Sequence, residues 1–118
     1  MPRLVALLPA AGAGARFGAS AGLPKQYAHL LGEPMLLHAL RALLAHPLLE
    51  RAYVVLAPAD NYWQALDLGA MQSKVQALYC GGETRAESVA NALAQLVHEL
   101  KPNDWVLVHD AARPCLRL

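Results

Sequence analysis

Short apolar runs alternate along this chain with segments whose apolar residues recur at helical spacing. Four runs are continuous enough to predict buried strands: residues 4–8, 52–57, 75–80 and 105–108. The second run contains the β-branched pair Val54-Val55 and is bounded by Pro58. Strands that are apolar on both faces are typical of a parallel sheet covered by helices on each side.

The segments between these runs predict helices. One helix is indicated by leucines at positions 36, 37, 40, 43 and 44, and His46-Pro47 would end it. Residues 59–66 predict a short second helix. A third opens at Thr84-Arg-Ala-Glu87, which has the form of a capping box. Its expected apolar face consists of Val89, Leu93, Leu96, Val97 and Leu100.

This alternation predicts an α/β fold with a mostly parallel sheet and right-handed crossovers. No linker or low-complexity tract divides residues 1–118, so we expect a single domain. Ligands of such sheets bind beyond the carboxyl ends of the strands. Three polar segments of this chain follow strands in that way.

Composition narrows the class of protein. Hydrophobic residues make up 56% of the chain and charged residues 16%, which excludes a disordered chain. The net charge of +1 argues against a general nucleic-acid surface. Cys80 and Cys115 match no metal or redox spacing and fit unpaired thiols in a reducing cytosol. The apolar run before Pro9 is shorter than that of a signal peptide, and no run approaches a membrane span. We therefore expect a cytoplasmic protein without a membrane segment.

The first polar segment is a glycine-rich loop after the first strand, Pro9-Ala-Ala-Gly12-Ala-Gly14-Ala-Arg16, followed by Pro24-Lys25-Gln26-Tyr27. Backbone N–H groups around residues 11–14 are suited to cradle a polyphosphate. Arg16 offers a forked donor for phosphate oxygens, and Lys25 offers a mobile point charge. Two known patterns do not fit, because Phe17 occupies the third position of a dinucleotide fingerprint and Gln26 follows Lys25. Taken singly, the glycines fit an ordinary turn, and Arg16 and Lys25 fit solvated surface residues.

The second polar segment is Gly81-Gly82-Glu83-Thr84-Arg85-Ala-Glu87-Ser88. Two glycines before a capped helix are expected to expose N–H groups that read a base edge or a ribose hydroxyl. The Ser88 hydroxyl would add a further donor or acceptor. A plain helix entry with a capping box explains Thr84 and Glu87, but not the paired glycines together with Arg85 and Ser88.

The third polar segment, His109-Asp110-Ala111-Ala112-Arg113-Pro114, follows the last strand. Asp110 is well placed to ligate Mg²⁺ beside a triphosphate. Arg113 is suited to pair with a phosphorylated co-substrate. In the alternative interpretation, Asp110 caps a turn and Arg113 pairs with it.

Together these motifs closely resemble those of the 2-C-methyl-D-erythritol 4-phosphate cytidylyltransferase family of the non-mevalonate isoprenoid pathway. The matching pieces include Gly-x-Gly-x-Arg16, Pro24-Lys25-Gln26-Tyr27, Gly81-Gly82-x-x-Arg85-x-x-Ser88 and Val108-His-Asp-Ala-Ala-Arg-Pro-Cys115. They follow one another in the family's order. The resemblance implies a Rossmann-like, three-layer nucleotidyltransferase fold.

The resemblance also implies an activity: transfer of a cytidylyl group from CTP to methylerythritol phosphate, with Mg²⁺ and release of pyrophosphate. Arg16 and Lys25 match the residues that stabilise the transition state in the family. The positions that match nucleotide-binding residues are Ala10, Ala11, Gly12, Gly14, Gly82, Glu83, Ser88, Asp110 and Ala111. Arg113 would lie near the acceptor, Asp110 near the metal, and the whole enzyme would be a homodimer.

Two departures from the family accompany these matches. Arg16 and Lys25 are separated by two more residues than is usual, and the chain is about half the family's length, so it corresponds to the N-terminal part of a single domain. Two alternatives therefore stay open: a ribitol-phosphate cytidylyltransferase, and a non-catalytic CTP-binding fragment. A nicotinamide-binding domain is disfavoured because of Phe17.

Overall fold

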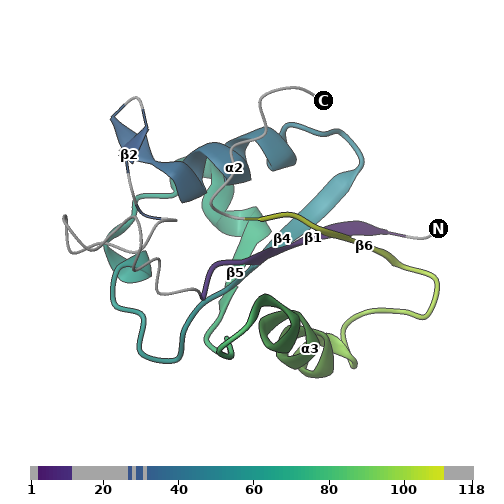
Figure 1. Cartoon of the computed structure of the whole chain (residues 1–118). Coiled ribbons are helices and arrows are strands. Elements are labelled where there is room, and N and C mark those ends of the chain that lie inside the picture. The colour runs from purple at the N-terminus through teal and green to yellow at the C-terminus, as the bar shows by residue number, and fades with distance from the viewer. Residues whose placement is uncertain (1–2, 12–26, 28, 31, 111–118) are drawn as a thin grey trace.

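The computed structural model of the chain describes residues 3–11, 27, 29–30 and 32–110. Its centre is a sheet of four parallel strands in the order β5-β4-β1-β6 (Figure 1). These strands are β1 (Leu4–Pro9), β4 (Leu49–Val55), β5 (Val75–Leu78) and β6 (Trp105–Val108). All four predicted runs form strands, although β4 begins at Leu49 rather than Ala52 and β5 ends at Leu78 rather than Cys80. The prediction that the fourth strand is buried is wrong, because 69% of Trp105 and 44% of Leu107 are exposed at this edge of the sheet.

The sheet is covered on opposite faces by α2 (Met35–Leu44) and α3 (Arg85–Leu96), which gives the three layers seen in Figure 1. Side chains alternate between the faces along β1. Ala6 and Leu8 belong to the core on the α2 side, whereas Val5 and Leu7 belong to the core on the α3 side. The predicted three-layer α/β fold with a parallel sheet is confirmed.

The buried face of α3 differs from the predicted apolar face. The helix buries Ser88, Ala92 and Leu96, which are spaced by four residues, while 41% of Leu93 and 62% of Val97 are exposed. A serine occupies the sheet side because its hydroxyl oxygen accepts a hydrogen bond from the Gly82 N–H at 3.0 Å. The predicted apolar face of α3 is therefore right for Leu96 but wrong for Leu93 and Val97.

The predicted helix over residues 59–66 is also wrong. This range contains only one short 3₁₀ turn, η2 (Trp63–Ala65), and a second, η3 (Gly69–Lys74), follows it. The Asp60 carboxylate accepts the backbone N–H groups of Tyr62 and Trp63 at 2.9 and 3.0 Å. An aspartate that bonds to nearby N–H groups competes with the helical pattern and favours a turn.

A small antiparallel pair, β2 (His29–Leu30) and β3 (Glu33–Pro34), precedes α2 and was not predicted. Gly32 lies in its turn with a φ of 86°, which favours glycine. Arg41 of α2 donates to both carboxylate oxygens of Glu33, at 3.0 and 3.1 Å, and so links the helix to this pair. Within the described ranges, no helix has both the length and the apolar character needed to cross a bilayer.

Candidate functional site

The strand order reverses direction beside β1, which is where ligands of α/β sheets bind. From β1 the chain proceeds outward through β4 to β5, and then returns to pair β6 with the other side of β1. The strand order therefore changes direction between the neighbouring strands β1 and β6. Such a topological switch point, at the carboxyl ends of the strands, is the usual ligand position. Ala10 and Ala11 follow β1 at this point, and His109 and Asp110 follow β6.

Backbone hydrogen bonds hold these strand ends in place. The Ala10 N–H donates to the Val55 oxygen at 2.7 Å, and the His109 N–H donates to the Leu7 oxygen at 3.0 Å. Leu56 links the ends of β4 and β5. Its N–H donates to the Leu78 oxygen, and its own carbonyl oxygen accepts the Gly81 N–H, both at 2.8 Å. All three segments that were predicted to carry the chemistry thus start from one fixed edge of the sheet.

The Gly81-Gly82 loop touches the loop that follows β1. A Cβ atom on Gly81 would collide with the Cβ of Ala11 and would lie 2.9 Å from the Leu56 oxygen. Glycine is required here because of this close approach, not because of its backbone angles. The contact joins two segments that are far apart in the sequence and were both predicted to bind nucleotide.

The N–H groups of the glycine loop are used within the chain. Gly82 donates to Ser88 Oγ, while Glu83 and Thr84 donate to Oε1 of Glu87 at 2.8 and 3.2 Å. Glu87 N–H donates back to Thr84 Oγ1 at 3.1 Å, so the predicted capping box is confirmed. The expectation that these N–H groups are exposed is wrong, because the capping box and Ser88 already occupy them.

Two further glycine-loop contacts bear on its shape. A Cβ atom on Gly82 would lie 2.6 Å from the Glu87 Cβ. Asn91 Nδ2 donates to the Cys80 oxygen at 2.9 Å.

Cys80 is a free thiol, as predicted, and burial raises its pKa, which keeps it protonated at neutral pH.

Asp110 is half-buried and follows the end of β6, at the topological switch point. No group of three or more His, Cys, Asp or Glu residues that could hold a metal occurs in the described part of the chain. A single carboxylate fits Mg²⁺ of the kind that is held mainly by substrate phosphates and water. It does not fit a metal site built from protein ligands alone.

Several predicted site residues lie outside the described residues. These are Gly12, Gly14, Arg16, Lys25, Ala111 and Arg113. Among the described ones, Ala11, Gly82 and Ser88 are linked by the contacts above, through Gly81. Asp110 lies at the same edge of the sheet.

The sequence motif contains Tyr27, but its partner Asp60 was not predicted. Tyr27 is 3% exposed, and its hydroxyl donates to Asp60 Oδ2 at 2.8 Å. Burial and the Asp60 carboxylate raise the pKa of Tyr27 far above its usual range, so it stays protonated. The Asp60-Asn-Tyr turn signal was visible in the sequence, but its partner 33 residues earlier was not.

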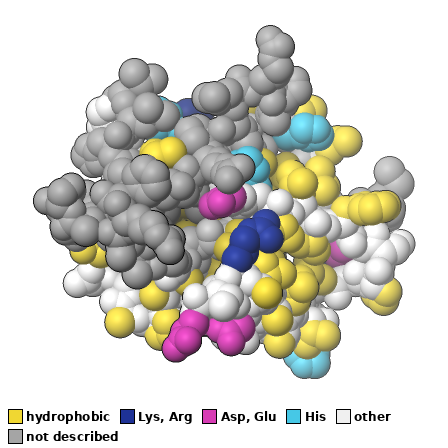
Figure 2. Space-filling view, viewed as in Figure 1, with side chains coloured by type: hydrophobic (Ala, Val, Ile, Leu, Met, Phe, Trp, Pro, Cys, Tyr) yellow, Lys and Arg dark blue, Asp and Glu magenta, His cyan; other side chains and the backbone are white. Residues whose placement is uncertain are grey.

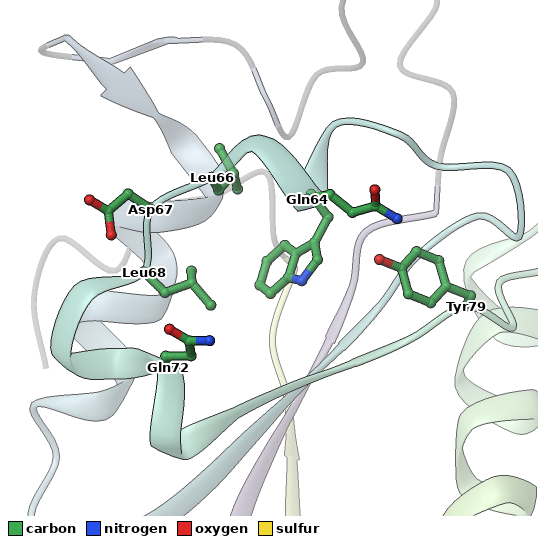
Figure 3. A pocket seen from close by; sticks show the side chains of 7 residues that line it. Gln64, Leu66, Asp67, Leu68, Gln72 and Tyr79 are labelled. Carbon is green, nitrogen blue, oxygen red and sulfur yellow. The ribbon is translucent and has the colours of Figure 1, made fainter.

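A cavity of about 420 Å³ lies on the β5 side of the fold, away from the switch point (Figure 3). Its lining combines aromatic and polar side chains: Trp63, Gln64, Leu66, Asp67, Leu68, Gln72 and Tyr79. Asp67 Oδ1 accepts the Gly69 N–H at 3.0 Å, so this carboxylate stabilises a turn.

Among the described residues that Figure 2 shows, charged side chains do not gather into one basic region. The visible dark-blue and magenta side chains are interspersed among hydrophobic ones. This agrees with the near-neutral net charge of +1. Any positive potential that attracts phosphate would therefore come from a few cations close to the site.

Known proteins resemble this chain over almost its whole length. The family model of 2-C-methyl-D-erythritol 4-phosphate cytidylyltransferase matches residues 4–118. Proteins of that name from Dechloromonas aromatica and Nitrosospira multiformis are 54% and 51% identical to it, each over 98% of this chain and 50% of their own length. The chain thus spans about half the length of these curated relatives.

Solved structures agree with the sequence relatives. A crystal structure of 4-diphosphocytidyl-2C-methyl-D-erythritol synthase superposes with a TM-score of 0.80 at 32% identity, covering 99% of this chain and 50% of that one. The Francisella tularensis 2-C-methyl-D-erythritol 4-phosphate cytidylyltransferase gives 0.69 at 36% identity, covering 98% and 47%. The chain belongs to the 2-C-methyl-D-erythritol 4-phosphate cytidylyltransferase family.

Proposed function

We propose that residues 1–118 form the N-terminal part of a single domain that transfers a cytidylyl group from CTP to 2-C-methyl-D-erythritol 4-phosphate. Family membership supports the reaction. The observation that carries it to this chain is the contact between Gly81 and Ala11. It joins two of the predicted nucleotide-binding motifs at the edge of the sheet where the third, which contains Asp110, begins.

In the proposed reaction, a phosphate oxygen of the acceptor attacks the α-phosphorus of CTP. A new P–O bond forms, the bond from the α-phosphorus to the β-bridging oxygen breaks, and pyrophosphate leaves with that electron pair. Negative charge increases on the α-phosphoryl oxygens during the attack. Arg16 and Lys25 stabilise this charge, and loss of one such fixed donor typically raises the barrier by about 3–4 kcal/mol.

The remaining proposed contacts bind and orient the substrates. Backbone groups of the loop after β1 lie against the phosphates, and the glycine loop after β5 holds the cytidine. The residues are Ala10, Ala11, Gly12 and Gly14 for the first group, and Gly82, Glu83 and Ser88 for the second. Asp110 and Ala111 lie near the ribose or phosphates, and Arg113 lies near the phosphate of the acceptor.

Mg²⁺ is the proposed cofactor, held by Asp110 together with CTP phosphates. When bound, it would neutralise phosphate charge and favour departure of pyrophosphate. As the family resemblance implies, we also propose that the whole enzyme is a cytoplasmic homodimer that binds neither nucleic acid nor a membrane.

The direct test uses a chimera in which residues 1–118 are followed by the remaining half of the Dechloromonas aromatica relative. With labelled CTP, we expect the chimera to convert methylerythritol phosphate and release pyrophosphate. Turnover of ribitol phosphate alone would overturn the choice of acceptor. CTP binding without turnover of either acceptor would support a non-catalytic role instead.

A further inference from the structure

The cavity beside β5, which we call the β5 cavity, has no part in the proposed chemistry. In the sheet order β5-β4-β1-β6, β5 is an edge strand, and β4 separates it from β1 and the switch point. The volume of the cavity, about 420 Å³, falls within the range of about 300–1,000 Å³ that is typical of small-molecule sites. The size and the separate position make the cavity a candidate for a second ligand.

The apolar part of the β5 cavity is anchored to the core. Trp63, Leu66 and Leu68 line the cavity, are partly buried and pack against the core on the α2 side of the sheet. Sites for small molecules combine apolar and aromatic walls of this kind with a few polar groups. The indole of Trp63 also gives the cavity a flat surface against which an aromatic ring can stack.

Polar side chains at the cavity are available to a ligand. Gln64, Gln72 and Tyr79 line it and are exposed, and none of the three side chains hydrogen-bonds to another described residue. The side chains of Gln64 and Tyr79 point toward one another on one side of the cavity, whereas Gln72 lies on the other side with Leu68 (Figure 3). Two amides and a hydroxyl thus offer both donors and acceptors around the apolar wall.

Asp67 decides the charge that the cavity favours. Among the described residues that line it, only Asp67 carries a formal charge. Its Oδ1 accepts the Gly69 N–H at 3.0 Å, while its Oδ2 accepts no hydrogen bond from a described residue. A carboxylate oxygen in this position favours a cationic or N–H-donating ligand and disfavours an anion.

Backbone and side-chain hydrogen bonds form the shape of the β5 cavity without a ligand. The Trp63 N–H donates to Asp60 Oδ1 at 3.0 Å, and the Leu66 N–H donates to the Trp63 oxygen at 3.0 Å. The next turn is held in the same way, because the Met71 N–H donates to the Leu68 oxygen at 3.0 Å. A preformed site loses less entropy when its ligand binds than one that must first be ordered.

We propose that the β5 cavity binds a small planar aromatic ligand that carries a cationic, N–H-donating group such as an amidine. The ring would stack on Trp63, whose face attracts cations more strongly than that of other aromatic residues. The cationic group would donate to the Asp67 carboxylate in a charge-assisted hydrogen bond. This inference does not rest on the proposed function, because it involves none of the residues to which we assign a role in cytidylyl transfer.

The test is an NMR titration of the chimera with three probes of similar shape: benzamidine, benzamide and benzoate. They carry a positive charge, no charge and a negative charge, respectively. We expect benzamidine to bind with a Kd of about 1 mM, benzamide about tenfold more weakly, and benzoate not measurably. The side-chain N–H signals of Trp63, Gln64 and Gln72 should shift with one common Kd. The indole signal of Trp105, an exposed tryptophan of β6, is the internal control and should not move.

Two matched variants test the role of the carboxylate. Asp67→Asn keeps an oxygen for the Gly69 N–H and removes the charge, so the advantage of benzamidine over benzamide should fall from about tenfold to about twofold. Glu50→Gln removes the same charge from an exposed residue of β4 that does not line the cavity, and should leave that advantage unchanged.

Three results would overturn the inference. The first is a benzamidine shift that stays linear up to about 20 mM or affects the Trp105 indole equally, which would indicate nonspecific contact. The second is an equal effect of Asp67→Asn and Glu50→Gln. The third is displacement of benzamidine by CTP, which would assign the cavity to the nucleotide site. None of these measurements requires turnover, so the first two results leave the proposed cytidylyl transfer intact.

Discussion

The close approach of Gly81 to Ala11 predicts that Gly81→Ala destabilises the protein. The added Cβ would meet the Ala11 Cβ and lie 2.9 Å from the Leu56 oxygen. Both atoms are attached directly to backbone that hydrogen bonds hold at the strand ends, so neither can rotate away. Overpacking of this kind costs about 1–3 kcal/mol, and we expect about 3 because the obstacles are rigid.

The measurement is thermal unfolding of the chimera. For a domain of roughly 150–250 residues, a loss of about 3 kcal/mol lowers Tm by about 6–12 °C. Ala11→Gly removes one of the two obstacles, so the double variant should be more stable than the sum of the single effects predicts. We expect a coupling of about 1 kcal/mol, as for residues in direct contact.

Gly32→Ala is the matched control for this pair. Its added Cβ meets nothing within 4 Å, and only its φ of 86° opposes the substitution. It should cost about 1–2 kcal/mol, and Ala11→Gly should not relieve that cost. Our account would be refuted if Gly81→Ala melted at the wild-type temperature, or if Ala11→Gly failed to relieve its effect.

Three further predictions concern single side chains. Ser88→Ala leaves the Gly82 N–H without its acceptor, so it should cost about 1–3 kcal/mol in denaturant titration and weaken CTP binding in calorimetry; unchanged values would contradict this. Backbone N–H groups and the neighbouring guanidinium lower the pKa of the Asp104 carboxyl. The stabilisation by this carboxylate is therefore complete above the unfolded pKa of about 3.9 and is lost as pH falls through the lower folded pKa. In that acid range, Asp104→Asn should make the midpoint of urea unfolding depend less on pH. Arg16→Ala and Lys25→Ala should each lower kcat about 10²–10³-fold with little change in CTP affinity, whereas the exposed Lys101→Ala should not; equal losses in affinity would mean that the cations bind only the ground state.

The elements best predicted from the sequence are those whose burial leaves a local pattern. Residues 4–8 form a strand in the interior of the sheet, where both faces need apolar side chains. Residues 105–108 form a strand at the edge of the sheet, and Trp105 and Leu107 are exposed there. The capping box at Thr84 and Glu87 was predictable because its partners lie three residues apart. Such features need no knowledge of distant contacts.

Features that depend on distant partners escaped prediction. The turn at Asp60 replaced a predicted helix because its carboxylate bonds to nearby N–H groups and to Tyr27, 33 residues earlier. The buried face of α3 was misassigned because Ser88 turns toward Gly82, and a polar residue on the sheet side has no hydrophobic signal. The motifs predicted the segments that we propose form the site, but not that the N–H groups of the glycine loop are bonded within the chain.

The central position of β1 has a consequence for folding during synthesis. β1 is paired on both sides, with β4 from Leu49 onward and with β6 from Trp105 onward. Neither partner exists when β1 leaves the ribosome, and the second is completed only after about a hundred residues. Contacts this distant in sequence form slowly, so β1 must wait as an unpaired apolar segment. Chaperones that recognise unpaired apolar segments would find a target in β1.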